Sequence, residues 1–398
     1  MRFIILLITC FLLSGCGYDE YKMPEDAYLN TEEKKITVYE EAHIYDLIKD
    51  TNTEILTKNA NITTDIIGKK ELIIEYKYEK RKYKLKVNYE VIDKTAPIFI
   101  SAATSRTIKV NDDYYPCDEI VFGDNYDREP TCEIEGFYDL TTVGTYHVSY
   151  IIKDSSNNET KKNLRVNVVD EISKSNSSTT NKVTLPISTV IEDKKTEHTM
   201  IGIDVSRWQE NIDFEKVKNA GVEFVIMRMG INSDIDKDIS VDSYFAQNIE
   251  AAKNAGLKVG VYVYTTATNV DTAIEHAKWT LETLNGEQLD FPIAFDWENW
   301  NKFRKYGISI HDLNETFEAF AKTIKAAGYE TMLYSSKFYL ENIWDTTMNY
   351  PIWLAHYISN TNYEGDYFLW QMSNVGRVDG INGDVDIDIL YKEKSTFN

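Results

Sequence analysis

A regular alternation of short apolar runs and amphipathic segments constrains the fold of the second half of the chain more than any other feature. The apolar runs predict eight strands, at 201–205, 222–229, 257–264, 291–298, 329–335, 352–357, 367–372 and 385–390. The amphipathic segments between the first five strands predict helices at 213–220, 241–255, 271–284 and 311–327. Three of these helices end in Ala-Gly, and glycine suits the left-handed backbone conformation that closes a helix.

The last four predicted strands follow one another with little helical pattern between them. Eight strands with helices mainly in the first half predict an α/β fold over residues 199–398, a closed (β/α)8-like barrel with some helices missing. Barrels of this class place their functional groups at the carboxyl ends of the strands. The polar residues at these ends are therefore the candidates for a site.

Two kinds of side chain gather at the predicted strand ends. The acidic ones, which we expect to be catalytic, are Asp204, Asp296, Glu298 and Asp386. The others, which we expect to bind substrate, are Arg228, Tyr262, Tyr264, Trp353, Tyr357, Trp370 and Gln371. Two acids also have a structural explanation, because Asp204 could cap a helix or lie in a turn, and Asp386 could belong to a turn or a cation site.

Asp296 and Glu298 are the most informative of these acids, because they close the apolar run 291–295. Residues two apart on a strand point the same way, so we expect the two carboxyl groups to lie side by side while Trp297 faces away. Each acid raises the pKa of the other, so one stays protonated while its partner is charged. Such a pair can cleave a glycosidic bond, and the spacing alone leaves open a retaining or an inverting route.

The first fifteen residues predict a signal peptide. The apolar run 3–13 is too short to span a bilayer as a helix. The sequence LSGC at 13–16 resembles the bacterial lipobox, in which the chain is cut before a cysteine that carries a lipid. We therefore expect residues 1–15 to be removed and Cys16 to anchor an extracytoplasmic protein to the bacterial membrane. An ordinary signal peptide with an incidental cysteine is the alternative.

Four cysteines occur in the chain, and the signal peptide takes Cys10 while the lipid takes Cys16. Cys117 and Cys132 remain, in a compartment that is oxidising and favours disulfides. We expect these two cysteines to form a disulfide. Two free buried thiols are the alternative, because the sequence does not show how close their Cα atoms lie.

Residues 31–170 show the period-two alternation of short strands. Two units within this region close alike, which predicts all-β sandwich domains at 31–93 and 94–170. The second resembles the bacterial immunoglobulin-like repeats of surface proteins in its segments DKTAP and GTYHVSYIIKDSSNNET. We expect residues 16–30 to be a tether and the Ser/Thr/Asn-rich residues 171–198 to be a flexible linker.

A net charge of −21 argues against a nucleic-acid partner, because phosphate backbones select basic surfaces. It argues equally against charge-driven adhesion to an anionic cell wall, so attachment to the cell is expected to depend on the lipid. No His/Cys/Glu spacing suggests a metal site and no glycine-rich phosphate loop occurs, so we expect no metal and no cofactor.

Several barrel segments resemble glycoside hydrolase family 25, the Chalaropsis-type lysozymes, in the order of that family. They are GIDVSRWQ followed by NIDF, AGVEFVIMRMG, AGLKVGVYVY, PIAFDWEN, YPIWLAHY and LWQMSNVGRVDGINGDVDID, over about 190 residues. The resemblance implies hydrolysis of the β-1,4 bond between N-acetylmuramic acid and N-acetylglucosamine in peptidoglycan. It implies that Glu298 is the general acid and base, that Asp296 steadies the reacting centre, and that Asp204 and Asp386 flank them.

The chain departs from the family pattern at three positions. Glu210 replaces a glycine, Met372 an aromatic residue, and Asp388 a common asparagine. We expect these changes to affect subsite affinity more than activity.

The leading interpretation is a lipid-anchored N-acetylmuramidase whose β-domains space the enzyme from the membrane and whose partner is peptidoglycan. The alternative is a glycan-binding or adhesive surface protein with a weakly active or inactive barrel. The intact pair of Asp296 and Glu298 favours the enzyme.

Overall fold

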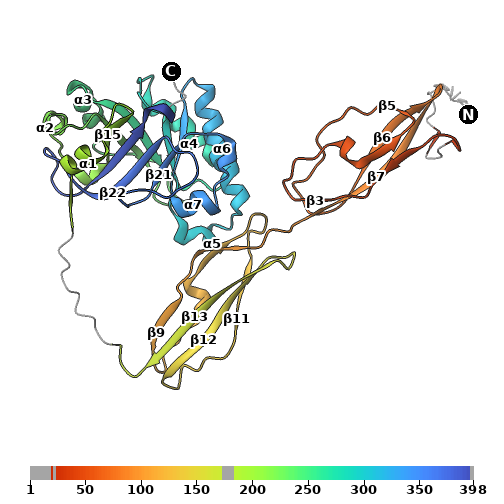
Figure 1. The fold of residues 1–398 in the computed structure, drawn as a ribbon, viewed down its shortest axis with the longest axis horizontal. Coiled ribbons are helices and arrows are strands. Elements are labelled where there is room, and N and C mark those ends of the chain that lie inside the picture. The colour runs from red at the N-terminus through yellow and green to blue at the C-terminus, as the bar shows by residue number, and fades with distance from the viewer. Residues whose placement is uncertain (1–18, 21–23, 173–182, 395–398) are drawn as a thin grey trace, which may run out of the picture. The chain divides into compact units, whose positions relative to one another are not determined.

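The computed structural model describes residues 19–20, 24–172 and 183–394 (Figure 1). The expected signal peptide and the expected lipidated Cys16 lie outside the described residues. The chain divides into two compact units, Met1–Thr95 and Ala96–Asn398. Within the described ranges, every helix is too short or too polar to traverse a lipid bilayer.

A long antiparallel hairpin dominates the first unit. Its two strands, β6 (Gly68–Tyr78) and β7 (Arg81–Ile92), pair along the whole length of β6. The smaller strands beside this hairpin are β1 (Asp19–Glu20), β3 (Lys35–Thr37) and β5 (Glu54–Ile55). A separate two-stranded sheet consists of β2 (Leu29–Thr31) and β4 (Ile48–Thr51). Buried Val87, Tyr89 and Val91 alternate with more exposed residues along β7, which is the period of two that the sequence predicts.

The first part of the second unit, up to residue 170, consists of strands. A four-stranded sheet has the order β11 (Thr131–Glu135), β12 (Gly144–Lys153), β13 (Glu159–Val169) and β9 (Ser105–Lys109). A two-stranded sheet pairs β8 (Ile98–Ser101) with β10 (Val121–Gly123). Cys117 and Cys132 form a disulfide with their Cα atoms 5.9 Å apart, so that prediction is confirmed. The immunoglobulin-like character of the two β-domains stays a prediction.

Direct contacts join this β-domain to the barrel within the second unit. The guanidinium of Arg304 lies 4.2 Å from the ring centroid of Phe122. Arg128 makes a bidentate pair with Asp312, with nitrogen–oxygen distances of 2.7 and 2.9 Å. The two domains are therefore packed together, in addition to being joined along the chain.

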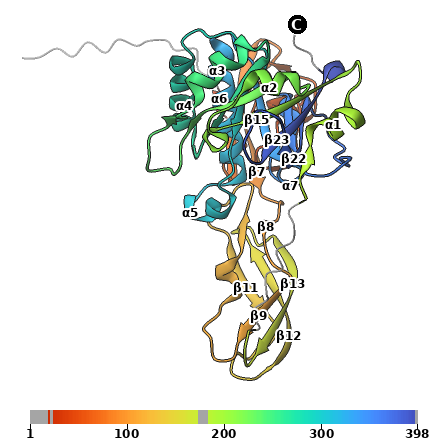
Figure 2. The same ribbon diagram turned by 90° about the vertical axis from the view of Figure 1, so that its left-hand side faces the viewer.

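Eight strands close into a barrel, which confirms the predicted number. In order around the barrel they are β15 (Thr199–Val205), β16 (Phe224–Ile231), β18 (Lys258–Tyr264), β19 (Ile293–Asp296), β20 (Thr331–Ser336), β21 (Ile352–Ala355), β22 (Leu369–Arg377) and β23 (Val385–Tyr391). A two-residue strand, β17 (Ser240–Val241), pairs with β16 outside this ring. Figure 2 shows β15, β23 and β22 side by side where the barrel closes.

The last strand differs from the expectation for such a barrel, because β23 runs antiparallel to both β22 and β15. The connection from β22 to β23 is short and contains no helix, so the chain turns back directly. Asp386 is therefore the second residue of its strand, where we expected it near a carboxyl end. The reversal still brings it to the same face of the barrel, since it lies opposite Asp204 in the register.

Four helices lie where the sequence predicts them: α2 (Phe214–Asn219), α3 (Phe245–Asn254), α4 (Val270–Leu284) and α6 (Ile310–Ala326). The Ala-Gly ends of three of them behave as predicted, with φ of +97° at Gly221, +74° at Gly256 and +87° at Gly328. Two short helices, α5 (Phe303–Tyr306) and α7 (Lys337–Asn342), were not predicted.

The expectation of a flexible linker through residue 198 is wrong for its second half. β14 (Leu185–Pro186) pairs with β22, and α1 (Ile187–Lys194) follows it. Ile187 and Val190 of α1 are buried in the core that surrounds the barrel strands. These residues lie three apart and form one apolar helix face, which the polar composition of the segment conceals.

Candidate active site

A pocket of about 180 Å³ opens at the end of the barrel where the parallel strands finish. The residues that line it are Asp204, Tyr262, Asp296, Glu298, Tyr334, Trp353, Tyr357, Gln371 and Asp386. All four predicted acids are among them, although they come from three different strands and the segment after β19. The barrel therefore gathers these acids at one opening.

The strand β19 places the central pair as its sequence predicts. Asp296 is the last residue of β19 and Glu298 follows two residues later, and both line the pocket. Trp297 faces away from the pocket and is fully buried, and its indole Nε1 donates a hydrogen bond to the Ala267 carbonyl oxygen at 3.0 Å. This buried anchor fixes the backbone between the two acids.

The environment of the pair favours protonated carboxyl groups. Burial, followed by the charges of Glu298 and Asp204, raises the pKa of Asp296 well above its usual range, and Arg228 opposes this shift. Glu298 keeps access to solvent, but the surrounding protein partly desolvates its carboxyl group and raises its pKa as well. The pair therefore titrates at higher pH than two solvated acids, and it can hold a proton for transfer.

One oxygen of Asp296 is available for a ligand. Its Oδ1 atom is buried and has no hydrogen-bond partner among the described residues. A buried carboxylate oxygen without a donor is costly, so such atoms in pockets are suited to accept a hydrogen bond from a bound molecule.

Two further acids flank the pair from the closure of the barrel. Asp204 on β15 and Asp386 on β23 are direct partners in the antiparallel register. Burial, followed by the charges of Asp204 and Glu298, raises the pKa of Asp386 to about 8. Burial, followed by the charge of Asp388, raises the pKa of Asp204. At neutral pH the four acids therefore carry less negative charge than their number suggests.

Aromatic and amide side chains form the rest of the wall. The hydroxyl groups of Tyr334 and Tyr357 donate hydrogen bonds to Gln371 Oε1 at 2.8 and 2.9 Å, and Gln371 Nε2 donates to Asp204 Oδ2 at 2.7 Å. Tyr357 remains 52% exposed, so its ring is available at the rim. Sequence reasoning missed Tyr334, which stands at the end of the predicted strand 329–335 and directly opposite Asp296.

Three of the expected substrate-binding residues do not line the pocket. Arg228 is buried in an ion pair with Asp242, with nitrogen–oxygen distances of 2.6 and 2.8 Å. Tyr264 donates a hydrogen bond to Asn299 at 3.2 Å. Trp370 packs in the surrounding core and donates to the His356 carbonyl oxygen at 2.9 Å. Strand alternation explains the last case, because neighbouring Gln371 takes the inward position.

The three departures from the family pattern have different structural effects. Glu210 keeps a backbone conformation that favours glycine, with φ of +51°. Met372 is buried away from the pocket wall. Asp388 is completely buried and accepts a hydrogen bond from Trp353 Nε1 at 2.9 Å.

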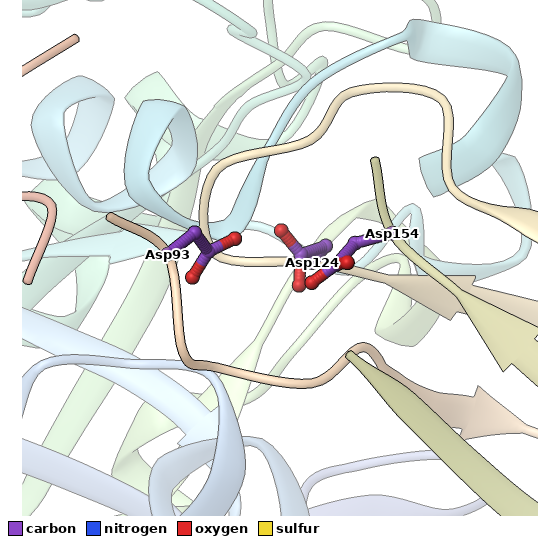
Figure 3. Close-up of side chains that lie close together, drawn as sticks. All are labelled: Asp93, Asp124 and Asp154. Atoms are coloured by element: carbon purple, nitrogen blue, oxygen red, sulfur yellow. The ribbon is translucent and has the colours of Figure 1, made fainter. Parts of the chain in front are cut away.

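A group of buried aspartates elsewhere has a spacing that a metal ion could share. Asp93, Asp124 and Asp154 each offer one carboxylate oxygen, and these oxygens lie within 4.8 Å of one another (Figure 3). Each residue directly follows a strand and accepts hydrogen bonds from backbone N–H groups of the next few residues. These local turns hold the Oδ1 atoms of the three aspartates in place.

The fold and the pocket together define a class of protein. A pocket at the end of a barrel, with two adjacent carboxyl groups of raised pKa, is the arrangement that glycoside hydrolysis needs. Residues 203–381 match the family model for glycosyl hydrolases family 25. The uncharacterized protein YegX of Escherichia coli K12 is 32% identical over 197 residues, which make up 48% of this chain and 70% of that protein. The chain therefore belongs to glycosyl hydrolases family 25.

Two other proteins resemble the chain. The autolytic lysozyme of Clostridium acetobutylicum is 32% identical over 191 residues, which cover 48% of this chain and 55% of the lysozyme. A solved structure of the modular autolysin LytC from Streptococcus pneumoniae, in complex with a synthetic peptidoglycan ligand, is 27% identical with a TM-score of 0.44. That match covers 61% of this chain and 56% of LytC. The chain thus spans little more than half the length of these two proteins.

Proposed function

We propose that the barrel hydrolyses peptidoglycan as an N-acetylmuramidase, cleaving the β-1,4 bond between N-acetylmuramic acid and N-acetylglucosamine. The observation that carries the proposal is the adjacent pair of Asp296 and Glu298 in the pocket, with both pKa values raised. Membership of glycosyl hydrolases family 25 supports a glycosidic bond as the target. The similarity to an autolytic lysozyme supports the cell wall as its source.

Glu298 is the proton donor in this proposal. Burial raises its pKa, which favours the protonated carboxyl group that a proton donor needs, and its solvent access lets water reach it after the bond breaks. The proton passes to the glycosidic oxygen as the leaving sugar departs. The ionised Glu298 then takes a proton from the attacking water, which restores its starting state.

Asp296 steadies the reacting sugar. Its buried Oδ1 atom lacks a donor among the described residues, and the N–H of the N-acetyl group on the sugar can supply one. Holding that group fixes the ring relative to Glu298. The configuration of the first product decides between a retaining route through the acetamido oxygen and an inverting route.

Attachment to the membrane belongs to the same proposal and is supported by the LSGC sequence at 13–16 after an apolar run. A lipid on Cys16 would hold the enzyme at the outer face of the membrane, next to the wall. Mass spectrometry of the mature N-terminus tests this point. A lipid-modified Cys16 is expected, and an unmodified N-terminus would end the idea.

The hydrolysis is tested by incubating the full chain with purified peptidoglycan and identifying the new reducing ends. N-acetylmuramic acid at the new ends is expected, and N-acetylglucosamine there would overturn the bond assignment. The folded Glu298→Gln variant is the control for contaminating activity, because an amide cannot transfer the proton. Binding to peptidoglycan without new reducing ends would instead favour a glycan-binding protein.

A further inference from the structure

Asp388 is a completely buried acid that the proposed reaction does not use. It lies on β23, opposite Gly202 of β15 and opposite Gln371 of β22. Gly202 has no side chain, and the acid that β15 contributes is Asp204, two residues further along the strand. Asp388 therefore lies below the pocket, on the strand between β15 and β22 that closes the barrel.

The two oxygens of Asp388 have different surroundings. Oδ1 accepts the hydrogen bond from Trp353 Nε1 at 2.9 Å. Oδ2 is buried. When Asp388 and Asp204 are both ionised, this oxygen has no N–H or O–H donor among the described residues. The carboxyl groups of Asp388 and Asp204 are nevertheless within hydrogen-bonding reach of each other. A hydrogen bond between two carboxyl groups requires a proton on one of them.

We propose that Asp388 is a positioning residue whose carboxyl group shares one proton with Asp204, and that this bond fixes Asp204 and Gln371 at the base of the pocket. The shared proton completes a continuous network. Trp353 donates to Asp388, and Gln371 donates to Asp204 at 2.7 Å. Tyr334 and Tyr357 in turn donate to Gln371. The orientation of the exposed Tyr357 ring thus depends on a bond at the bottom of the site.

The electrostatic surroundings favour retention of that proton. Asp388 and Asp204 are 0% and 5% exposed, and two ionised carboxylates at that depth would repel each other without solvent screening. The ionisable groups that face the pair from neighbouring elements are Asp386, Asp296, Glu298, Tyr262, Tyr334 and Tyr357. None of these facing groups is a cation. Burial is the largest cause that raises the pKa of each member.

Two substitutions separate the shared proton from mere packing. In Asp388→Asn, the amide oxygen can accept from Trp353 and the amide N–H can donate to Asp204 without a titratable proton. In Asp388→Leu, the volume is kept but both hydrogen bonds are lost. Thr280→Val is the matched control, because it removes a buried hydroxyl group on α4 that donates to the His276 carbonyl oxygen of the same helix and lies outside the pocket.

The direct test uses infrared difference spectra of the substrate-free full-length protein at neutral pH, with ¹³C-labelled aspartate to identify carboxyl bands. Compared with the wild type, the Asp388→Asn variant is expected to lose one protonated carboxyl band and to gain none. Loss of no protonated band, or of two, would overturn the shared proton. This result does not depend on catalysis.

The kinetic test rests on the proposed hydrolysis. Asp388→Asn should keep kcat/KM at neutral pH and lose less activity than wild type as pH rises, because its bond to Asp204 cannot be broken by deprotonation. Asp388→Leu should lose at least ~10-fold in kcat/KM while it stays folded, as expected when a hydrogen bond to a charged group is removed. Equal losses in both variants, or no loss in either, would contradict a positioning role. If the wild type itself cleaves no peptidoglycan, the proposed function fails. The infrared spectra still show whether Asp388 and Asp204 share a proton.

Discussion

Acidic side chains serve opposite purposes in the N-terminal hairpin and in the barrel pocket. In the first unit, glutamates on the hairpin and its neighbours pair with lysines across the strands: Glu54 with Lys77, Glu71 with Lys86, Glu75 with Lys84, and Glu90 with Lys35. These pairs remain partly exposed, and water screens them. In the pocket, acids are next to acids, and Arg228 is already paired with Asp242. Burial beside other acids raises the pKa of a carboxyl group, so that it can hold a proton.

The largest expected difference between the two regions is in catalysis. Glu298→Gln should lower the turnover of peptidoglycan fragments by ~10²–10⁴-fold, because general acid catalysis is removed while the shape is kept. Glu71→Gln is the matched substitution in the hairpin and should leave turnover unchanged. Circular dichroism confirms that both variants are folded. Near-wild-type turnover of a folded Glu298→Gln protein would remove this residue from its role.

Much of this site could be predicted because the signal is local. Asp296 and Glu298 follow an uninterrupted apolar run, so strand periodicity alone places them side by side. The same rule fixes Trp297 on the outer side. The disulfide between Cys117 and Cys132 follows from counting cysteines in an oxidising compartment.

The features that could not be predicted depend on how strands are arranged around the barrel. The contact between Asp388 and Asp204 requires β23 to lie next to β15, and the periodicity of β23 does not reveal its direction. Trp370 and Gln371 are adjacent in a strand whose faces are both covered, so composition does not show which one points inward. The apolar face of α1 is too short to stand out in a polar segment.

The second prediction concerns how pH acts on stability. The pKa of Asp386 is about 8 in the folded protein against 3.8 for the free group. Below about pH 4 the group is protonated in both states, so its contribution to stability is fully present. Between about pH 4 and 8 only the unfolded state releases the proton, so the free energy of unfolding falls as pH rises.

Asp386→Asn removes this contribution and should flatten the pH dependence. At pH 8 the variant should be more stable than wild type by an amount on the order of a few kcal/mol. Guanidinium unfolding at pH 4.5, 6 and 8 measures the difference. Glu71→Gln is again the control, and curves for wild type and Asp386→Asn that stay parallel across this range would contradict the prediction.

The third prediction concerns what holds the β-domain that precedes the barrel. The disulfide joins residues 15 apart in sequence, and its loss should lower the stability of that domain by ~3 kcal/mol. Calorimetry of wild type and of a Cys117→Ser/Cys132→Ser variant measures the effect. Peptidoglycan turnover should persist, because the pocket residues come from the barrel. Loss of turnover in a folded variant would show that the packing of Arg304 on Phe122 transmits the change.

The smallest expected effect is in the exposed pairs of the hairpin. Glu71 and Lys86 lie 3.1 Å apart, and their side chains are 50% and 49% exposed. A double-mutant cycle with Glu71→Ala and Lys86→Ala should give a coupling free energy of ~0.2–1 kcal/mol, because water competes for both charges and the side chains lose freedom when they pair. The coupling should shrink further in 1 M salt, where the screening length is about 3 Å. A coupling above ~2 kcal/mol, or one that salt leaves unchanged, would mean that these charges are desolvated like those of the pocket, and the contrast between the two regions would no longer hold.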